Sequence, residues 1–484
     1  MLFIGIDLGT SAVKLLLMDE TGRIRNSVSR PCAVSYPRPG WSEQNPEDWY
    51  RVTMEGLHAL LADCDRRQVR GLSVGGQMHG LVALDRQGQV IRPAILWNDG
   101  RSEAEVRFLN EEIGRDRLTA WTGNIAYAGF TAPKLLWMRQ HEPENFAEIH
   151  KILLPKDYLL WRLTGEYVTD PSDASGTLYY DVAGKCWSAP MLALLQISEE
   201  QLPRVCESSA AAGTLRPEIA RELGLGQVTA AAGAGDNAAA AVGTGTVGAG
   251  SCNISLGTSG TIFLPLDRFA VDPHNALHAF AHADGGYHLM GCMLSAASCG
   301  KWWVEDILQT QDYGRELTET DSSVFFLPYL MGERSPLNDA AARGVFFGLS
   351  MDTTRQQLTR AVYEGVTFGL RQCMEAARTM GAAPAQTTLC GGGARSPVWQ
   401  QLCADILGIP VLLPESEEGP AGGAAMLAMC ACGLYPDVQA AAAALCRTRA
   451  RILPDFARVR MYDEKYEKWK QIYPAVRELY RVIC

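Results

Sequence analysis

The tetrapeptide Leu-Gly-Thr-Ser occurs twice in the chain, at Leu8–Ser11 and again at Leu256–Ser259. Each copy lies between two runs of strand-forming residues, which are Phe3–Asp7 and Val13–Met18 for the first copy. A strand–turn–strand unit that is repeated about 250 residues later is typical of a duplicated domain. We therefore predict two similar halves that face each other across a cleft, each with its own ligand-binding turn.

The boundary between the halves is predicted in the glycine-rich run at 243–250, which gives domains 1–245 and 246–484. The same run contains a formal GxGxxG match, Gly243–Gly248. A dinucleotide fingerprint follows a strand and opens a helix, whereas here a predicted helix, Asn237–Val242, comes first. The pattern therefore argues against a dinucleotide-binding fold.

Helical and strand patterns alternate along the first half. Asn45-Pro46 has the form of an N-cap followed by proline at the first helical position, and an apolar face continues the helix. Strands are predicted at Val69–Val74, Leu81–Leu84 and Val90–Trp97. Strands that alternate with helices define an α/β fold class.

The charge balance and the cysteines exclude several classes of function. The 484 residues carry 44 Lys and Arg against 54 Asp and Glu, a net charge of −10, which argues against a nucleic-acid or membrane-surface partner. No apolar run has the length of a membrane span, and the start has no basic segment typical of a signal peptide. The 14 Cys form no CxxC pair, so we expect reduced thiols and a cytoplasmic protein.

The two repeated turns have the chemistry of a phosphate cradle. Each offers backbone N–H groups and hydroxyls at a bend where glycine allows close approach, as a polyphosphate requires. Asp7 ends the strand before the first turn, where phosphate would repel a bare carboxylate, so we expect it to hold Mg²⁺ through water. The alternative is a pair of hairpin turns without a ligand.

Two further glycine-rich loops lie between a strand and a helix. In Leu389–Ser396 three consecutive glycines leave backbone on which a purine or ribose could lie, although a plain strand-to-helix turn would also use them. Asp236, in the loop GAGDN, stands where a strand ends and a helix begins. It is either a general base at the carboxyl end of a strand or an N-cap.

Polar residues of the kind that bind a polyol follow two predicted strands. In GGQMHG, Gln77 and His79 can bond hydroxyl groups, and Met78 can pack on a carbon chain. In LWNDGR, Trp97 offers a stacking ring and Arg101 a polar group. The alternative for the lone histidine is a structural role.

Two other patterns are interpreted as structural. His274, His278 and His282 have helical spacing, but their segment alternates like a hairpin around glycines, which argues against a metal site. Aromatic and apolar residues from Tyr462 to Tyr480 step by three and four, which predicts a helix face packed on the core or on a second subunit, with a kink at Pro474.

Taken together, these motifs resemble the FGGY family of carbohydrate kinases, in the actin-like ATPase superfamily. The family's first signature is matched by Gly129–His141 and its second by Gly344–Gly365. The resemblance extends nearly end to end, and it includes GIDLGTSAVK, GGQMHG, AILWNDGR, LLPKDYL, TDPSDASGT, GAGDNAAAAVG, LPYLMGERSP and CGGGARS. Within the family the set is most like that of kinases for a ketopentose, D-xylulose.

The resemblance implies two ribonuclease-H-like domains that close on ATP, Mg²⁺ and a sugar, in a cytoplasmic homodimer. It implies that Asp236 is the catalytic base, that Asp7 positions Mg²⁺ and phosphate, and that Asn237 joins the sugar contacts. The nucleotide-binding residues that it implies are Thr10, Ser11, Lys14, Gly257, Thr258, Ser259, Gly391, Gly392, Gly393 and Ala394.

One departure from the family pattern and two alternative functions remain open. Related kinases often have glycine where this chain has Ala234, and the added methyl could narrow the sugar pocket. A kinase for another ketose or polyol, such as ribulose, ribitol or glycerol, would share most of the motifs. A non-catalytic actin-like ATPase would share the turns but would not need the polar groups of GGQMHG and LWNDGR.

Overall fold

The structure is a computed structural model, which describes residues 1–318 and 320–483. The chain forms two compact units. Unit 1 comprises Met1–Val247, Ala279–Tyr287 and Glu418–Cys446, and unit 2 comprises Gly248–His278, His288–Glu417 and Arg447–Cys484. The domain division at residue 245 stays a prediction. The compact units are not continuous in sequence, because the later segments Ala279–Tyr287 and Glu418–Cys446 belong to unit 1.

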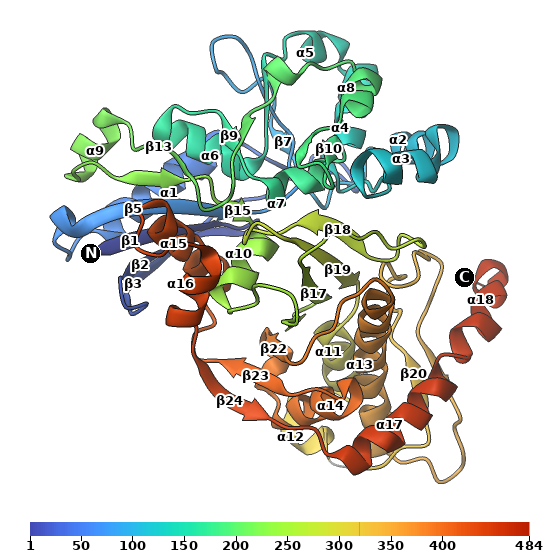
Figure 1. The fold of residues 1–484 in the computed structure, drawn as a ribbon. Coiled ribbons are helices and arrows are strands. Elements are labelled where there is room, and N and C mark those ends of the chain that lie inside the picture. The colour runs from blue at the N-terminus through green and yellow to red at the C-terminus, as the bar shows by residue number, and fades with distance from the viewer. Residues whose placement is uncertain (319, 484) are drawn as a thin grey trace. The chain divides into compact units, whose positions relative to one another are not determined.

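The sheet of unit 1 has the strand order β13-β14-β5-β1-β2-β3 (Figure 1). Strand β1 pairs antiparallel with β2 and parallel with β5, and β14 and the short β15 also pair parallel with β5. The strands are β1 Leu2–Leu8, β2 Ala12–Asp19, β3 Ile24–Pro31, β5 Val69–Gly76, β13 Ala211–Thr214, β14 Thr229–Ala231 and β15 Ala234–Gly235.

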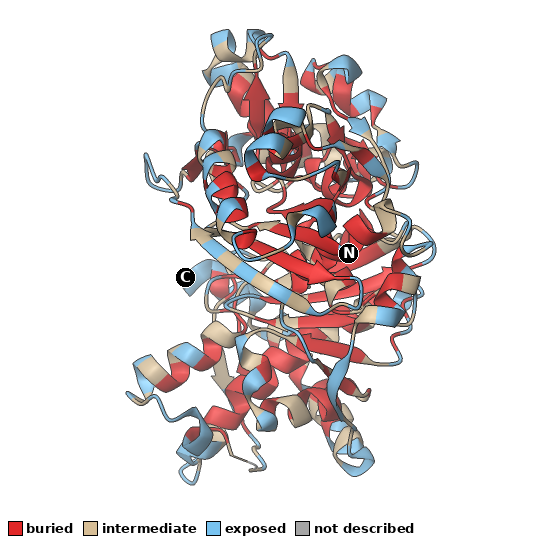
Figure 2. Cartoon of the chain, turned by 90° about the vertical axis from the view of Figure 1, so that its left-hand side faces the viewer, coloured by how far each residue is buried: buried red, intermediate tan, exposed pale blue. Residues whose placement is uncertain are grey.

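Helices α10 (Asp236–Gly243) and α15 (Gly419–Ala431) pack closely on this sheet and on each other (Figure 1). A Cβ atom on Gly5 of β1 would lie 1.9 Å from the carbonyl oxygen of Ala421, and one on Gly243 would lie 2.1 Å from that of Gly419. Glycine is therefore required at both contacts. On the sheet, β1 is almost wholly buried, whereas the edge strand β3 alternates between half-buried and exposed residues (Figure 2).

The remaining elements of unit 1 include helix α1, Pro46–Leu60, whose N-cap Asn45 accepts a bond from the Glu47 N–H as predicted. The other helices are α2 Glu103–Arg107, α3 Arg115–Thr122, α4 Thr131–His141, α5 Pro143–Ala147, α6 Pro155–Thr164, α7 Pro171–Ala174, α8 Ala189–Leu195, α9 Pro217–Leu223 and α16 Val438–Leu445. Short strand pairs are β4 Glu43–Gln44 with β7 Ala94–Ile95, β6 Val82–Leu84 with β8 Lys151–Leu153, β9 Val168–Thr169 with β12 Arg204–Val205, and β10 Tyr180–Asp181 with β11 Cys186–Trp187.

The sheet of unit 2 repeats the arrangement, with β19-β17-β16-β22-β23-β24 in order. Strand β16 pairs antiparallel with β17 and parallel with β22, as β1 does with β2 and β5, so the predicted ribonuclease-H-like α/β class is confirmed for both halves. The strands are β16 Asn253–Leu256, β17 Gly260–Leu266, β19 Tyr287–Met293, β22 Thr387–Cys390, β23 Val411–Pro414 and β24 Thr448–Ile452, with a separate pair, β20 Phe325–Leu327 and β21 Val345–Phe347.

Helix α13 (Arg355–Thr379) is the long central helix of unit 2, and a capping box of Thr354 and Gln357 begins it. The predicted aromatic stripe packs on its Phe368 through Tyr462, Tyr466 and Trp469. The other helices are α11 Ala297–Lys301, α12 Tyr313–Glu316, α14 Pro397–Leu407, α17 Phe456–Trp469 and α18 Ile472–Ile483. The predicted kink is a break between α17 and α18, because Pro474 has no N–H to continue the helical bonds.

One predicted strand, Val90–Trp97, is wrong for most of its length. Only Ala94–Ile95 forms a strand, β7, while Val90 makes an isolated bridge to Leu84. Pro93 stands between the two and lacks the N–H that a continuous ladder needs. The polar loop that carries Trp97 and Arg101 is accordingly longer than the pattern indicates.

Candidate active site

The sheet register of unit 1 brings Asp7 and the Asp236 loop to the same edge. Asp7 in β1 lies opposite Gly75 in β5, and Gly75 lies opposite Ala234 in β15. The carboxyl ends of three parallel strands thus meet there, which is where ligands bind in α/β sheets. Asp236 is the next residue after β15.

Asp236 is the first residue of helix α10, and the N-cap is Gly235. The N-cap interpretation of Asp236 is therefore wrong. Its Oδ1 accepts bonds from the backbone N–H of Asn237 at 2.7 Å and from the Asn237 side-chain amide at 2.9 Å. Burial raises the pKa of the half-buried carboxyl to about 6, although these two bonds lower it. A group with that pKa is ionised at neutral pH and still a useful base.

More negative than positive charge surrounds Asp7. Burial is the largest cause that raises the pKa of Asp7 to about 7. The charges of Asp236 and Glu418 also raise this pKa, whereas the charge of Lys14 lowers it. Lys14 lies opposite Asp7 across the β1–β2 pair and forms an ion pair with Glu418. A divalent cation would neutralise these carboxylates, so the surroundings of Asp7 fit Mg²⁺.

The protein supplies only part of a cation shell at this point. Across residues 1–318 and 320–483, no group of three or more His, Cys, Asp or Glu is placed to hold a metal ion. Mg²⁺ usually keeps water ligands and binds through one or two carboxylates together with substrate phosphates. One carboxylate, Asp7, at a phosphate turn matches that mode rather than a protein cage.

Met78 and His79 border the Asp236 loop. A Cβ atom on Gly235 would lie 3.0 Å from the Met78 sulfur, and that sulfur is 4.0 Å from the side-chain nitrogen of Asn237. The His79 ring stacks on Phe130 at 4.8 Å, and its Nδ1 is 2.7 Å from the carbonyl oxygen of Gly176. Met78 and Asn237 thus border Asp236, and His79 is the neighbour of Met78 in the chain.

The backbone of His79 is held in an uncommon conformation. Its φ is 70°, in the left-handed region that non-glycine residues rarely adopt. Its carbonyl oxygen accepts bonds from the Thr131 hydroxyl at 3.1 Å and from the Lys134 ammonium at 2.8 Å. Helix α4, which matches the first family signature, therefore fixes the orientation of the histidine.

Gln77 and Thr10 belong to one hydrogen-bonded network beneath the first turn. The Thr10 hydroxyl donates to Gln77 Oε1 at 3.0 Å and accepts from the Trp97 indole N–H at 3.0 Å. Gln77 is buried and donates to Gln44, which also donates to the Thr10 carbonyl oxygen. The network fixes the turn, so a direct sugar contact of Gln77 stays a prediction. The Trp97 ring is 44% exposed and open to a ligand.

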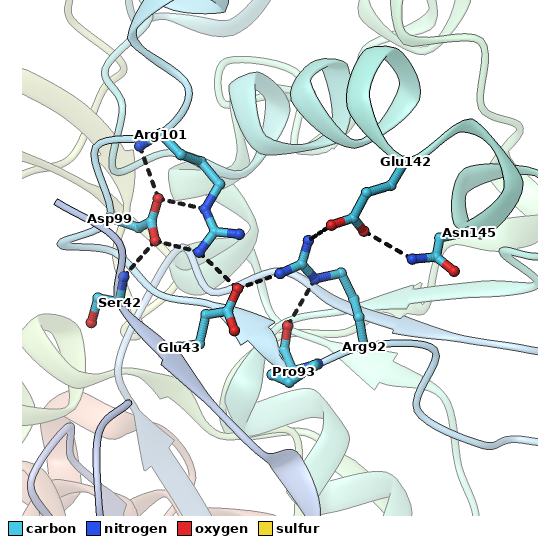
Figure 3. A network of polar contacts seen from close by, with 8 residues as sticks. All are labelled: Ser42, Glu43, Arg92, Pro93, Asp99, Arg101, Glu142 and Asn145. Atoms are coloured by element: carbon cyan, nitrogen blue, oxygen red, sulfur yellow. Dashed lines mark hydrogen bonds and ion pairs between the residues drawn. The ribbon is translucent and has the colours of Figure 1, made fainter. Parts of the chain in front are cut away.

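Arg101 lies in a buried charge network (Figure 3). Its guanidinium bonds both oxygens of Asp99 at 2.8 and 2.7 Å, pairs with Glu43 at 2.8 Å, and lies 3.7 Å from the centre of the Trp41 ring. The side chain is 1% exposed. Arg101 therefore braces the loop, and this burial argues against the direct sugar contact predicted for it.

Ala234 packs in the core beside the Asp236 loop. It is fully buried and belongs to an apolar cluster of unit 1 with residues such as Ala238, Val242 and Met426. This packing argues against the expected narrowing of the sugar pocket. Ser11, in contrast, is exposed in the first turn, as the prediction of a phosphate contact requires.

The second turn borders a pocket in unit 2. Gly257 follows β16, and Thr258 and Ser259 are exposed. The Thr258 carbonyl oxygen accepts the Ser298 hydroxyl at 2.8 Å, which ties the turn to helix α11. A pocket of about 670 Å³, a size that suits a nucleotide, is lined by Thr258, Ala297, Ser298, Lys301, Tyr313, Gly314, Leu317, Tyr363, Gly392, Gly393, Arg395, Ser396, Pro397, Val398 and Trp399.

The glycines of CGGGARS have different roles. Gly391 has φ +87°, and a Cβ there would lie 2.8 Å from the backbone of Leu256, so it allows the two loops to pass each other. A Cβ on Gly392 would meet nothing within 4 Å, so that position is open to the pocket. Ala394 is buried behind the loop.

This difference predicts opposite outcomes for two substitutions. Gly391→Ala should lower stability, by about 1–2 kcal/mol for the left-handed conformation alone, with the backbone clash added. Gly392→Val should melt like wild type but raise the KM for ATP about tenfold, since its side chain enters the pocket. Thermal melts and ATP titrations check both. Equal losses of stability in the two variants would contradict the assignment.

Several polar residues next to the site were not singled out from the sequence. Lys156, Asp170, Ser172 and Asp173 form a buried cluster beside the Asp236 loop. Their segments, LLPKDYL and TDPSDASGT, belong to the motifs of the family resemblance, but nothing in the sequence assigns a role to these individual residues. Buried charges of this kind are rare unless paired.

The segment that carries the spaced histidines is not one helix. His278 begins strand β18 (His278–Ala281), so the three spaced histidines do not share a helix face. The cysteines in the described part of the chain form no disulfide. Within residues 1–318 and 320–483, helices long and apolar enough to cross a membrane are absent.

Two family models match almost the whole chain. The N-terminal domain of the FGGY family of carbohydrate kinases matches residues 2–243, and the C-terminal domain of that family matches residues 252–432. The chain belongs to the FGGY family of carbohydrate kinases. It is therefore an enzyme of that class, whose members use ATP with Mg²⁺.

Named relatives narrow the comparison. A xylulose kinase of Escherichia coli K12 is 43% identical over 479 residues, which cover 98% of each chain. A solved xyloylose kinase from Brucella ovis has a TM-score of 0.95 and 43% identity, covering 99% of this chain and 100% of that one. A gluconate kinase from Lactobacillus acidophilus follows at a TM-score of 0.91 and 25% identity, covering 99% of each. The scaffold therefore does not by itself define the sugar.

Proposed function

We propose that this enzyme transfers the γ-phosphoryl group of ATP to the 5-hydroxyl of D-xylulose, giving D-xylulose 5-phosphate and ADP. The observation that carries the proposal is the half-buried Asp236 carboxylate, bordered by Met78 and Asn237. Relatives named xylulose kinase, 34–44% identical over most of the chain, support the choice of sugar.

In the proposed reaction Asp236 accepts the proton of the 5-hydroxyl as that oxygen attacks the γ-phosphorus. The bond from the γ-phosphorus to its bridging oxygen breaks, and ADP leaves with that electron pair. Thr10, Ser11 and Gly257 offer N–H groups to phosphate oxygens, whereas the Gly9 N–H donates to the Ala12 carbonyl oxygen at 3.1 Å. Mg²⁺ near Asp7 would supply charge neutralisation for the transferred group. Asn237 orients Asp236, since it donates two bonds to one of its oxygens.

The assignment of the nucleotide to unit 2 rests on its pocket. Gly392 and Gly393 expose backbone on one side, while Tyr363, Trp399 and Leu317 provide apolar walls for a base. Lys301 and Arg395 add positive charge at the lining. Thr258 belongs to the same lining, so phosphates of a nucleotide bound here would reach the second turn.

A coupled assay of ADP release against ketopentoses, pentitols, gluconate and glycerol tests the substrate. D-xylulose should give the largest kcat/KM of the panel. ADP release that D-xylulose does not raise above the sugar-free rate, while another polyol does, would leave the family intact and show that the proposed sugar is wrong. The gluconate arm matters because a gluconate kinase shares the scaffold.

The pKa of Asp236 predicts the acid side of the pH profile. A base must be deprotonated to act, so kcat/KM should fall about tenfold per pH unit below about 6, the value to which burial raises this pKa. The charges nearby are Asp7, Lys14, Glu418 and the buried Asp173. Burial raises the pKa of Asp7 to about 7, so protonation of Asp7 adds to the fall over the same range. Initial rates from pH 5 to 8, with the coupling enzymes in excess at each pH, give the profile. A flat profile down to pH 5 would contradict Asp236 as the base.

Homodimer formation and a cytoplasmic location stay predictions. Sedimentation of the purified protein would settle the first. Neither is needed for the reaction as proposed, because the residues assigned to sugar, base and nucleotide all come from one chain.

A further inference from the structure

A chain of buried polar groups leads from the interior of unit 1 to the Asp236 loop. The Ser172 hydroxyl accepts the backbone N–H of Gly235 at 3.1 Å and donates to Asp170 Oδ2 at 2.5 Å. The Ser208 hydroxyl donates to the same oxygen at 2.7 Å. The other oxygen of Asp170 lies 3.1 Å from the Lys156 ammonium. All four side chains are buried.

The cluster is costly for the fold. Lys156 is fully buried and faces three carboxylates, with Asp157 at 2.7 Å, Asp170 at 3.1 Å and Asp173 at 3.9 Å. Burial raises the pKa of Asp173 well above its ordinary value, although the Lys156 charge lowers it. The charges of Asp157, Asp170 and Asp236 raise it further. Apolar residues of similar size would often be at least as stabilising as such a set. A role beyond stability is therefore the more economical explanation.

The Gly235 N–H that Ser172 accepts belongs to a tightly constrained loop. Gly235 is the N-cap of α10, and Asp236 follows it directly. Two residues earlier Gly233 has φ +81°, and a Cβ there would lie 2.1 Å from the Val74 carbonyl oxygen. Lys156 also donates to the Ala232 carbonyl oxygen at 3.3 Å. The buried polar groups thus hydrogen-bond to the backbone of the loop at both Ala232 and Gly235.

The segment that provides Ser172 also supports a predicted sugar contact. Helix α7 and the residues after it include Gly176, whose carbonyl oxygen lies 2.7 Å from His79 Nδ1. A Cβ on Gly176 would lie 2.3 Å from that same nitrogen. One short segment therefore sets the position of both the base loop and the histidine beside it.

We propose that Ser172, held by Asp170 and Lys156, is a positioning residue for Asp236 in phosphoryl transfer. The inference rests on the proposed function, in which Asp236 is the base. Ser172 fixes the Gly235 N–H and with it the start of α10, so that the carboxylate is aimed before the sugar binds. Displacement of a reacting group by about 1 Å can cost about 10²-fold in rate.

Ser208 provides a matched control for the test. Ser172→Ala and Ser208→Ala each remove one hydroxyl bond to the same oxygen of Asp170, but only Ser172 contacts Gly235 through its side chain. Ser208 reaches the loop through its carbonyl oxygen, which accepts the Gly233 N–H and survives the substitution. A merely structural role would make the two variants alike.

Steady-state kinetics and amide exchange on the full chain test the proposal. Ser172→Ala should lower kcat about 10- to 100-fold, while both KM values stay within about twofold of wild type. It should also speed hydrogen exchange of the Gly235 amide. Ser208→Ala should stay near wild type in kcat and in Gly235 exchange. Ser172→Thr, which keeps the hydroxyl, should restore most of kcat. Equal kcat in the two alanine variants, or unchanged Gly235 exchange in Ser172→Ala, would overturn the proposal.

Two provisions keep the test decisive. If Ser172→Ala does not fold, Ser172→Cys, which keeps the size but is a poorer acceptor, replaces it with the same expectations. If D-xylulose is not the substrate, the kinetic arm uses the sugar of the panel that is turned over, while the exchange arm needs no sugar. Failure of the proposed sugar and failure of the positioning role are therefore distinguishable.

Discussion

Asp236→Asn is expected to fold like wild type and to lose about 10²- to 10⁴-fold of its turnover. Asparagine keeps the Oδ1 acceptor for both bonds from Asn237, so the loop geometry should persist. It cannot accept the proton of the sugar hydroxyl. ATP affinity should stay the same or improve, because a negative charge near the phosphates is removed. Single-turnover ADP formation and ATP titration measure the two effects.

Stability provides an independent check on this variant. The folded-state pKa of Asp236 lies above the ordinary value, so the ionised carboxylate disfavours folding above about pH 6, and this cost disappears at low pH. The asparagine variant should therefore melt at or above the wild-type temperature at pH 8. Asp437→Asn, at the N-cap of α16, is the control, since asparagine caps as well as aspartate. If Asp236→Asn keeps more than a tenth of wild-type turnover, Asp236 is not the general base and another residue must accept the proton.

The repeated turn explains why the fold could be predicted from the sequence. Leu8–Ser11 and Leu256–Ser259 each join two antiparallel strands, and each leading strand pairs parallel with a later one. Strand propensity and turn chemistry are local, so a single sequence carries them. The N-cap at Asn45 was predictable for the same reason.

The errors come from properties that depend on tertiary packing. Arg101 resembles a ligand-binding residue in the sequence, yet Asp99, Glu43 and Trp41 enclose it in the fold. Ala234 lies in β15, which pairs with β5, and it packs in an apolar cluster. The loop motif GAGDN does not reveal this packing. A helix boundary displaced by one residue made Asp236 resemble an N-cap.

The Lys156 cluster illustrates the limit most clearly. Lys156 lies in α6, Asp170 and Ser172 lie at the start of α7, and Ser208 lies in a later loop. The folded chain brings these segments together beside Gly235. Residue type alone does not show which partner a charged side chain has. The candidate ligand-binding residues could thus be proposed from the sequence, whereas the residues that hold them in place could not.

Asp7→Asn is expected to lower kcat about 100-fold, the scale on which loss of one preorganised electrostatic group acts in phosphoryl or acyl transfer. The substitution keeps the size of the side chain in β1 but removes its charge. Since Asp7 is the carboxylate proposed to position Mg²⁺, the variant should also need a higher Mg²⁺ concentration for half-maximal rate. Initial rates over a Mg²⁺ series at saturating ATP and sugar measure both effects.

The control for Asp7→Asn is Asp85→Asn, in an exposed turn where the side chain accepts only backbone N–H groups. It should keep the wild-type rate and the wild-type Mg²⁺ requirement. Loss of kcat in Asp7→Asn without a change in Mg²⁺ requirement would show that Asp7 acts on the phosphates or on Asp236 by charge alone. In that case Asp7 is not the carboxylate that holds the ion, and Asp236 and Glu418, the other carboxylates beside it, are the next candidates.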